Sequence, residues 1–249
     1  MLELKHISYA VREGDSELGI LSDISLTIDD HRLVVFTGPN GGGKTTLAKI
    51  IMGLVQPTSG RILLDGEDIT ALSITERARR GISYAFQQPV RFKGLRVGDL
   101  MNLAAGKDAN IAEVCAYLSE VGLCARDYID RELDASLSGG ELKRIEIAMV
   151  LARGTALSVF DEPEAGIDLW SFQNLIRVFE KMYEQTRGSI LIISHQERIL
   201  NIADTIVLLK DGRLAECGPR EEVLPRLLRN IDTAPPVCSM LSDPIKEVR

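Results

Sequence analysis

The sequence predicts an α/β fold built on a mainly parallel β-sheet, and three observations support this prediction. A glycine-rich stretch, residues 38–46, follows a short apolar strand and precedes a helix. From Glu141 onward the predicted strands alternate with helices, and strands joined through helices usually lie parallel. Between these regions, residues 97–122 carry apolar side chains at helical spacing, with no predicted strand among them. We therefore expect a parallel sheet flanked by helices, with a helical lobe beside it.

The individual elements follow from local composition. Leu33–Phe36 is a short apolar, β-branched run typical of a buried strand, and Met1–His6 alternates as a strand does. Asp65-Gly66, Gly81 and Lys210–Arg213 are turn signals that separate elements. In chain order the later predicted elements are the helix Thr46–Met52, the strand Arg61–Leu64, the helix Ile74–Arg80, the strand Ile82–Phe86, the helix Glu141–Arg153, the strand Ala156–Phe160, the helix Leu169–Glu184, the strand Ile190–Ser194, the helix Gln196–Ile202 and the strand Thr205–Leu209.

Bulk composition limits the class of protein. The 249 residues, 45% of them apolar, can bury a substantial core. A net charge of −7 argues against a general nucleic-acid or anionic-membrane surface. No apolar run approaches the roughly 20 residues that a membrane-spanning helix needs, and the N-terminus lacks the build of a signal peptide. We therefore expect a soluble, cytoplasmic protein that binds no nucleic acid.

The four cysteines show no metal-binding spacing. They form no C-x-x-C pair, which suits reduced thiols in a cytosolic protein, and a metal or cluster site is the less favoured alternative. They are Cys115, Cys124, Cys217 and Cys238.

The glycine-rich stretch satisfies the pattern G-x-x-x-x-G-K-[ST]. Its glycines let successive backbone N–H groups point inward at phosphate oxygens, and the following helix adds the positive end of its dipole. Lys44 is predicted to reach the β- and γ-phosphates, and the Thr45 hydroxyl to take one coordination site of Mg²⁺. The sequence therefore predicts a nucleotide triphosphate held by Gly38, Pro39, Asn40, Gly41, Gly42, Gly43, Lys44, Thr45 and Thr46.

Two carboxylates follow the apolar strand at Leu157–Phe160. Asp161, at the tip of that strand, is placed to hold Mg²⁺, and Glu162 is the candidate general base that polarises an attacking water. Solvated loop carboxylates are the alternative, which the preceding phosphate loop makes much less favoured.

Leu137-Ser138-Gly139-Gly140-Glu141 builds a second anion-binding helix start. It lies about a hundred residues after the first, on the other side of the helical segment. Both could face one ATP in a single chain only if the helical lobe folded back. Two chains arranged head to tail satisfy the geometry better, because each then offers its second element to the ATP of the other.

These three motifs, in this order and spacing, resemble the Walker A, signature and Walker B motifs of an ATP-binding-cassette (ABC) ATPase. The resemblance implies a P-loop NTPase fold of the ABC-ATPase type, with an antiparallel β subdomain and a helical subdomain. It covers essentially residues 1–229, so we expect one ATPase domain over residues 1–231, with the helical subdomain at about 90–153. Residues 232–249 hold three prolines and are expected to form a flexible tail, or alternatively a segment that orders on a partner.

The resemblance also assigns smaller features. Gln87 resembles the Q-loop glutamine that senses Mg²⁺ and the attacking water, and Asp168 resembles the D-loop residue that contacts the partner subunit. His195 resembles the switch histidine on the γ-phosphate, and Tyr9 lies where the family places an aromatic residue against adenine. Glu13–Glu17 looks like an insertion that blurs the position of Tyr9. The implied catalytic set is Glu162, His195, Gln87 and Lys44, and the implied metal ligands are Thr45, Gln87 and Asp161.

Three stretches resemble SufC, the ATPase of an iron–sulfur cluster assembly system. They are Ala85–Val90, Ser138–Ile147 and Ser194–Leu200. Pro163 and a short helical segment instead depart from the common bacterial SufC form. The hypothesis that follows is a SufC-like ATPase that dimerises on ATP and moves a soluble SufB/SufD-type scaffold. The alternatives are an energy-coupling subunit that docks on a membrane permease beside Gln87, and, with less support, a DNA- or ribosome-associated ATPase.

Lys143, on the predicted helix after the signature, is expected to be a solvated surface lysine. Pairing with an acid near Glu162 or Glu164 is the weaker alternative.

Overall fold

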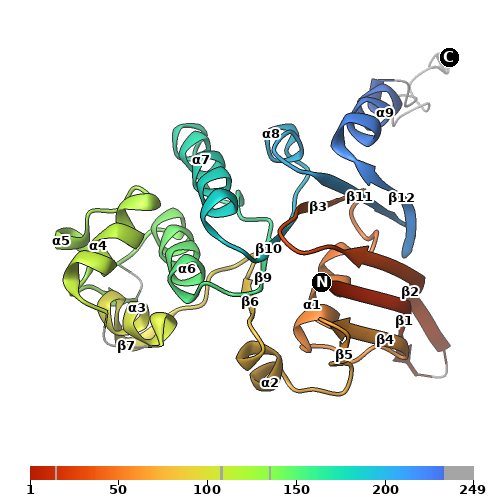
Figure 1. Ribbon diagram of the computed structural model, residues 1–249, viewed down its shortest axis with the longest axis horizontal. Coiled ribbons are helices and arrows are strands. Elements are labelled where there is room, and N and C mark those ends of the chain that lie inside the picture. The colour runs from red at the N-terminus through yellow and green to blue at the C-terminus, as the bar shows by residue number, and fades with distance from the viewer. Residues whose placement is uncertain (15, 107–108, 135, 233–249) are drawn as a thin grey trace, which may run out of the picture.

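A computed structural model describes residues 1–14, 16–106, 109–134 and 136–232, and it has a two-lobed architecture (Figure 1). In the first lobe an antiparallel sheet of four strands has the order β2-β1-β4-β5. Its strands are β1 (Leu2–Glu13), β2 (Ser16–Ile28), β4 (Ser59–Leu64) and β5 (Glu67–Asp68). The stretch that looked like an insertion therefore joins the two long strands of a hairpin, and the cross-strand partner of Tyr9 is Leu21.

The central sheet of six strands has the order β12-β11-β3-β10-β9-β6. Five strands run parallel and the edge strand β12 pairs antiparallel with β11. Every residue of β3, β9 and β10 is buried, as expected for the middle strands of a sheet covered on both faces. The strands are β3 (Leu33–Thr37), β6 (Ile82–Ala85), β9 (Leu157–Asp161), β10 (Ser189–Ile193), β11 (Thr205–Lys210) and β12 (Arg213–Pro219).

Helices cover both faces of the central sheet. Helix α1 (Lys44–Met52) packs between the two sheets, and α2 (Ile74–Arg79) lies beside it. The buried guanidinium of Arg77 on α2 donates to the Ile50 and Ile51 carbonyls at the end of α1, 2.6 and 2.8 Å away. This contact anchors the C-terminus of the helix that follows the phosphate loop.

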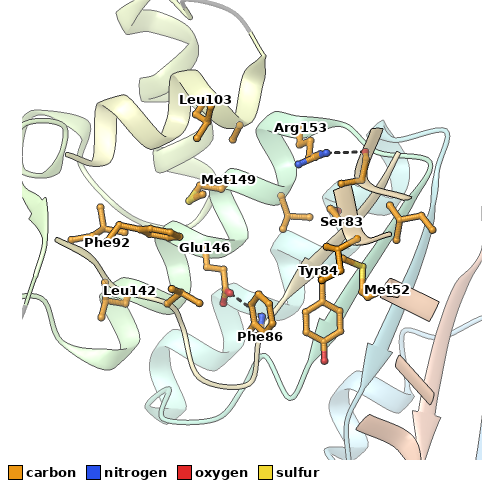
Figure 2. A pocket seen from close by; sticks show the side chains of 17 residues that line it. Met52, Ser83, Tyr84, Phe86, Phe92, Leu103, Leu142, Glu146, Met149 and Arg153 are labelled. Carbon is orange, nitrogen blue, oxygen red and sulfur yellow. Dashed lines mark hydrogen bonds between the residues drawn. The ribbon is translucent and has the colours of Figure 1, made fainter. Parts of the chain in front are cut away.

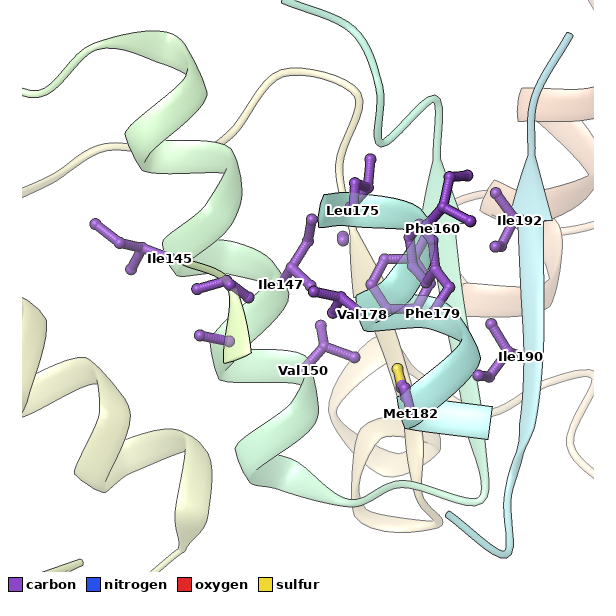
Figure 3. Close-up of a cluster of buried hydrophobic side chains, with 14 of the residues drawn as sticks. Ile145, Ile147, Val150, Phe160, Leu175, Val178, Phe179, Met182, Ile190 and Ile192 are labelled. Carbon is purple, nitrogen blue, oxygen red and sulfur yellow. The ribbon is translucent and has the colours of Figure 1, made fainter. Parts of the chain in front are cut away.

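The opposite face of the sheet carries α6 (Gly139–Arg153), α7 (Leu169–Gln185), α8 (Glu197–Leu200) and α9 (Arg220–Asp232). The figure of the core shows α7 lying against the sheet, with α6 on its outer side (Figure 3). Phe160 of β9 and Phe179 of α7 meet edge to face, with ring centroids 4.9 Å apart. This apolar layer fixes where α6, and so its N-terminus, stands relative to the sheet.

The second lobe is built on α6 from α3 (Val97–Ala105), α4 (Ile111–Glu120) and α5 (Ala125–Tyr128). It also holds a short ribbon of β7 (Phe92–Arg96) and β8 (Glu132–Leu133), which the sequence did not predict. These two strands are far apart in the chain and their pairing depends on the lobe's tertiary fold, so no local pattern indicates it.

An apolar groove with a cavity volume of about 320 Å³ opens where the lobe meets β6 (Figure 2). Phe86, Phe92 and Met149 line it, together with Leu103, whose residue surface is 74% exposed.

The strand predicted at Met1–His6 is longer than expected, because β1 continues to Glu13. The other predicted strands and helices occur within one or two residues of their expected ends. Gly53 ends α1 in a left-handed conformation, and the predicted Lys210–Arg213 turn joins β11 to β12. Strands β2, β5 and β12 and helix α9 were not predicted individually. The expected flexible tail, residues 232–249, lies outside the described residues except for Asp232, the last residue of α9.

Candidate functional site

The phosphate loop joins β3 to α1 and contains glycines at which a Cβ would clash with neighbouring atoms. Gly38 has φ +130°, and a Cβ there would lie 2.0 Å from the Leu209 carbonyl oxygen. Gly43 has φ +97°, and a Cβ there would lie 2.3 Å from a methyl carbon of the Leu21 side chain. Among the described residues no side chain caps α1, so its first N–H groups remain available to an anion.

Lys44 is buried within the turn of this loop. Its ammonium donates to the Gly38 and Pro39 carbonyls, 2.8 and 3.0 Å away. Burial lowers the pKa of Lys44, and the carboxylates of Glu162 and Asp161 oppose that shift. The loop thus presents one fixed cation among backbone donors, which suits a polyphosphate.

Asp161 lies at the carboxyl end of β9 and faces the start of α1. Its carboxylate accepts hydrogen bonds from the Thr45 hydroxyl (3.2 Å) and the Tyr84 hydroxyl (2.8 Å). Burial raises the pKa of Asp161, while these two hydrogen bonds act to lower it. Tyr84 was missed by sequence reasoning. Its position follows from the register of β6 on β9, which pairs Tyr84 with Val159, two residues before Asp161.

Glu162, Gln87 and His195 lie around the same strand ends. The Gln87 amide donates to the Glu162 carboxylate over 2.6 Å, and Glu162 is half-buried with a left-handed backbone (φ +44°). His195 follows β10, which lies between β3 and β9, and partial burial and the Lys44 cation lower its pKa. The structure therefore brings together all four predicted catalytic side chains.

The predicted signature residues stand at the N-terminus of α6. Ser138 caps the helix: its hydroxyl accepts from the Glu141 N–H (3.2 Å), and the Glu141 carboxylate accepts from the Ser138 N–H (2.7 Å). Tyr128 also donates to Glu141, and Arg131 lies 3.6 Å from the same carboxylate. These contacts hold the pKa of Glu141 at about 2, with the Tyr128 hydrogen bond as the largest cause.

The signature residues and the phosphate loop are not joined in one chain. Within the described residues, no hydrogen bond or ion pair links Ser138–Glu141 to Gly38–Thr46. The position of a Cβ on Gly140 instead lies 3.7 Å from the Gly166 carbonyl oxygen, next to the predicted D-loop.

The two remaining predicted contacts have local structural partners. Asp168 accepts hydrogen bonds from the N–H and hydroxyl of Ser171 at the start of α7, 3.0 and 2.6 Å away. Tyr9 is half-buried on β1, and its cross-strand partner Leu21 lies against Gly43. Tyr9 is therefore one strand away from the phosphate loop, on β1, and β2 is the strand that contacts the loop.

Lys143 corrects an expectation. It is not a solvated lysine: its side chain is 1% exposed, and its ion-pair partner is Glu146, 3.3 Å away, rather than Glu162 or Glu164. Residues 143 and 146 share the face of α6 that packs against the end of β6, which the helix pattern alone does not disclose. Glu164 instead accepts a hydrogen bond from Ser194, the residue before His195.

Parallel strands ending at a phosphate loop, with paired carboxylates and a second anion-binding helix start in a separate lobe, define an ABC ATPase. Comparison with known proteins agrees. A family model described as ABC transporter matches residues 21–165, and the chain belongs to that family. It is an ATPase.

Individual relatives carry transporter names. The chain is 41% identical to an uncharacterized ABC transporter ATP-binding protein of Methanocaldococcus jannaschii, over 86% of this chain and 87% of that protein. It is 34% identical to the lipopolysaccharide export system ATP-binding protein LptB of Escherichia coli, over 82% and 86%. It is 35% identical to the sulfate/thiosulfate import ATP-binding protein CysA 1 of Chromobacterium violaceum, over 86% and 61%. These names carry no iron–sulfur assembly role.

Solved structures share the fold. A dimeric ABC transporter cassette superposes with a TM-score of 0.81 at 23% identity, covering 88% of this chain and 99% of that one. A cassette dimer in a post-hydrolysis state, bound to ADP and Pi, gives a TM-score of 0.80 at the same identity and coverage.

Across the described part of the chain, no helix combines the length and apolar character required to cross a bilayer.

Proposed function

We propose that this chain is the ATP-hydrolysing, energy-coupling subunit of an ABC membrane transporter. The observation that carries the proposal is the open apolar groove lined by Phe86, the residue before Gln87, in a chain whose relatives have transporter names. Exposed apolar side chains such as Leu103 and Val90 border this groove. A short segment of a permease would bury them there, and its contact would lie one residue from the site of hydrolysis.

We infer that two copies bind two ATP molecules head to tail. Each chain carries a phosphate loop in one lobe and a signature helix in the other, and these two elements make no hydrogen bond to one another within the described residues. In the dimer, Ser138–Gly140 of one copy would face the ATP on the phosphate loop of the second. Asp168, beside the signature loop, would then contact the other subunit.

ATP fits the donors that the site presents. Lys44 and the N–H groups of the loop and of α1 would hold the phosphates, and Tyr9 would lie against the adenine. Thr45, Gln87 and Asp161 offer the oxygen ligands that Mg²⁺ prefers. Bound Mg²⁺ would supply neutralisation of the phosphate oxygens.

Hydrolysis is then assigned to the strand ends. Glu162 polarises the attacking water. The Gln87 amide, which lies 2.6 Å from the Glu162 carboxylate, orients that water. His195 and the signature residues of the second copy stabilise the charge that develops on the transferred phosphoryl group. Loss of the γ-phosphate that bridges the two copies lets them separate, and this movement drives the partner.

A SufC-like assembly ATPase, acting on a SufB/SufD-type scaffold, is the second candidate. The resemblance of three stretches to SufC is what favours it, and two of these stretches contact each other, because Lys143 and Glu146 both bind the backbone of Phe86. The names of the relatives favour the transporter, and both candidates use the same ATPase cycle.

The identity of the partner distinguishes the two candidates. A tagged Glu162→Gln chain is incubated with ATP and Mg²⁺ and used to capture partners separately from soluble and detergent-solubilised extracts of the native cell. Lys44→Ala, which removes the loop cation, is the matched control. A genuine partner is captured by Glu162→Gln only when ATP is present, and it is not captured by Lys44→Ala. Recovery of an integral membrane protein supports the transporter proposal. A soluble scaffold carrying iron and sulfide overturns it in favour of the assembly ATPase.

A further inference from the structure

Helix α6 buries two opposite charges one turn apart. The Lys143 side chain is 1% exposed and that of Glu146 is 15% exposed, and their charged groups lie 3.3 Å apart. Burial lowers the pKa of Lys143 and raises that of Glu146, and the attraction between the two opposes both shifts. A buried ion pair adds little net stability compared with apolar residues of similar size. Stability alone therefore does not explain why this pair is present.

Both groups bind the backbone of one residue in another segment. The Glu146 carboxylate accepts a hydrogen bond from the Phe86 N–H over 2.8 Å, and the Lys143 ammonium donates to the Phe86 carbonyl. The peptide groups on both sides of the Phe86 α-carbon are thus held on α6. We call Lys143, Glu146 and the Phe86 backbone the backbone clamp.

The backbone clamp lies between three functional features. Gln87, the next residue, donates to the Glu162 carboxylate over 2.6 Å. Ser138, at the start of α6, lies about 12 Å from Glu146 along the helix axis. Phe86 and Glu146 also line the apolar groove, where their hydrogen bond is visible (Figure 2).

We propose that Lys143 and Glu146 are positioning residues for ATP hydrolysis, which hold the Phe86 backbone on the signature helix and so place Gln87 against Glu162. The clamp makes the position of Gln87 depend on the position of α6. A movement of the signature helix, or the binding of a segment in the groove, would therefore shift the Phe86 backbone. That shift would change the position of Gln87 at the site of hydrolysis.

The test measures the ATPase kinetics of Glu146→Ala, Glu146→Gln and Lys143→Met. We expect Glu146→Ala and Lys143→Met to lower kcat about 10- to 100-fold and to change KM for ATP by less than about twofold, because misplacement of a reacting group affects the chemical step. Glu146→Gln retains an acceptor for the Phe86 N–H and should recover part of the loss. If Glu146→Ala fails to fold, Glu146→Gln and Lys143→Met carry the test.

A double-mutant cycle with Gln87→Ala separates positioning from general destabilisation. In that background, Glu146→Gln should lower kcat by less than about twofold, since the residue that it positions is already gone. Glu120→Ala, which removes the exposed partner of Lys181 in the same lobe, is the control and should leave kcat unchanged.

Two outcomes would overturn the inference, and they are distinguishable. It rests on the role proposed for Gln87, so a Gln87→Ala chain with normal kcat would refute that role and the clamp together. A Gln87→Ala chain with reduced kcat, in which Glu146→Gln still has its full separate effect, would leave the proposed function intact and refute the clamp alone.

Discussion

At the scale of single residues, the site depends on side chains that bridge elements. Asp161 accepts hydrogen bonds from Thr45 at the start of α1 and from Tyr84 on β6, so one carboxylate joins two elements of the lobe. Glu162 is joined in the same way to Gln87. Removing one of these side-chain groups should therefore affect either ATP binding or the chemical step, depending on which hydrogen bond is lost.

Glu162→Gln tests the assignment of the general base. The amide keeps the size of the side chain but cannot take a proton, so hydrolysis should slow by about 10²- to 10⁴-fold while ATP still binds. Turnover is measured with saturating ATP and Mg²⁺, and binding with a fluorescent ATP analogue. A variant with unchanged turnover would contradict this assignment.

At the scale of elements, the start of α6 is held by a cluster built from the lobe around it. Tyr128 of α5 and Arg131 both contact Glu141, and Glu141 in turn completes the cap of the helix with Ser138. Since Ser138 is the residue proposed to face the ATP of a second copy, this cluster sets the shape of the surface that the signature presents.

The pKa of Glu141 makes the stability of this cluster depend on pH. Its folded-state pKa of about 2 lies below its ordinary value of 4.5. The carboxylate therefore contributes stability that is complete above pH 4.5 and is lost as the pH falls toward 2.

Tyr128→Phe removes the largest cause of that shift. The variant should be less stable than the wild type at pH 7, by at most about 1.5 kcal/mol because the site is partly solvated. The difference should narrow as the pH falls below 4.5. Urea midpoints at pH 7, 5, 4 and 3 measure it, with Tyr117→Phe in the same lobe as the control. A difference that stays constant with pH would exclude Glu141 as its source.

At the scale of the whole molecule, the two lobes separate the two anion-binding helix starts. Helix α1 starts between the sheets, and α6 starts where the helical lobe is built on it (Figure 1). The groove and the backbone clamp lie at the junction of these lobes. The arrangement suits a protein that works by closing on a second copy and moving a partner.

Mixing two inactive chains tests the head-to-tail dimer. Lys44→Ala disables the phosphate loop and Ser138→Arg disables the signature, so each alone should have little ATPase activity. In a mixed dimer one composite site retains both intact elements, and random pairing should restore about a quarter of wild-type activity. Activity is followed as the ratio of the two chains is varied. If mixing restores nothing, each chain uses its own signature, and the head-to-tail dimer is wrong.

Much of this architecture could be predicted because the decisive information is local. Runs such as Leu33–Phe36 and Ile190–Ile193 are apolar over their whole length, which indicates central strands whatever surrounds them. The phosphate loop needs glycines and one lysine in a fixed order, so its sequence alone predicts that it binds a nucleotide triphosphate. The partner protein could not be predicted in the same way, because a surface selects the partner and no short motif specifies a surface.

The sequence by itself determined the fold class, the ABC ATPase motifs and the set of residues at the strand ends. Only the tertiary structure decided their partners. The Tyr84 hydroxyl reaches Asp161 through the register of β6 on β9, and Lys143 is buried against Phe86 because α6 packs on the end of β6. Such contacts join residues about 60 to 80 positions apart in the chain, and they depend on how elements pack rather than on the pattern within any one of them.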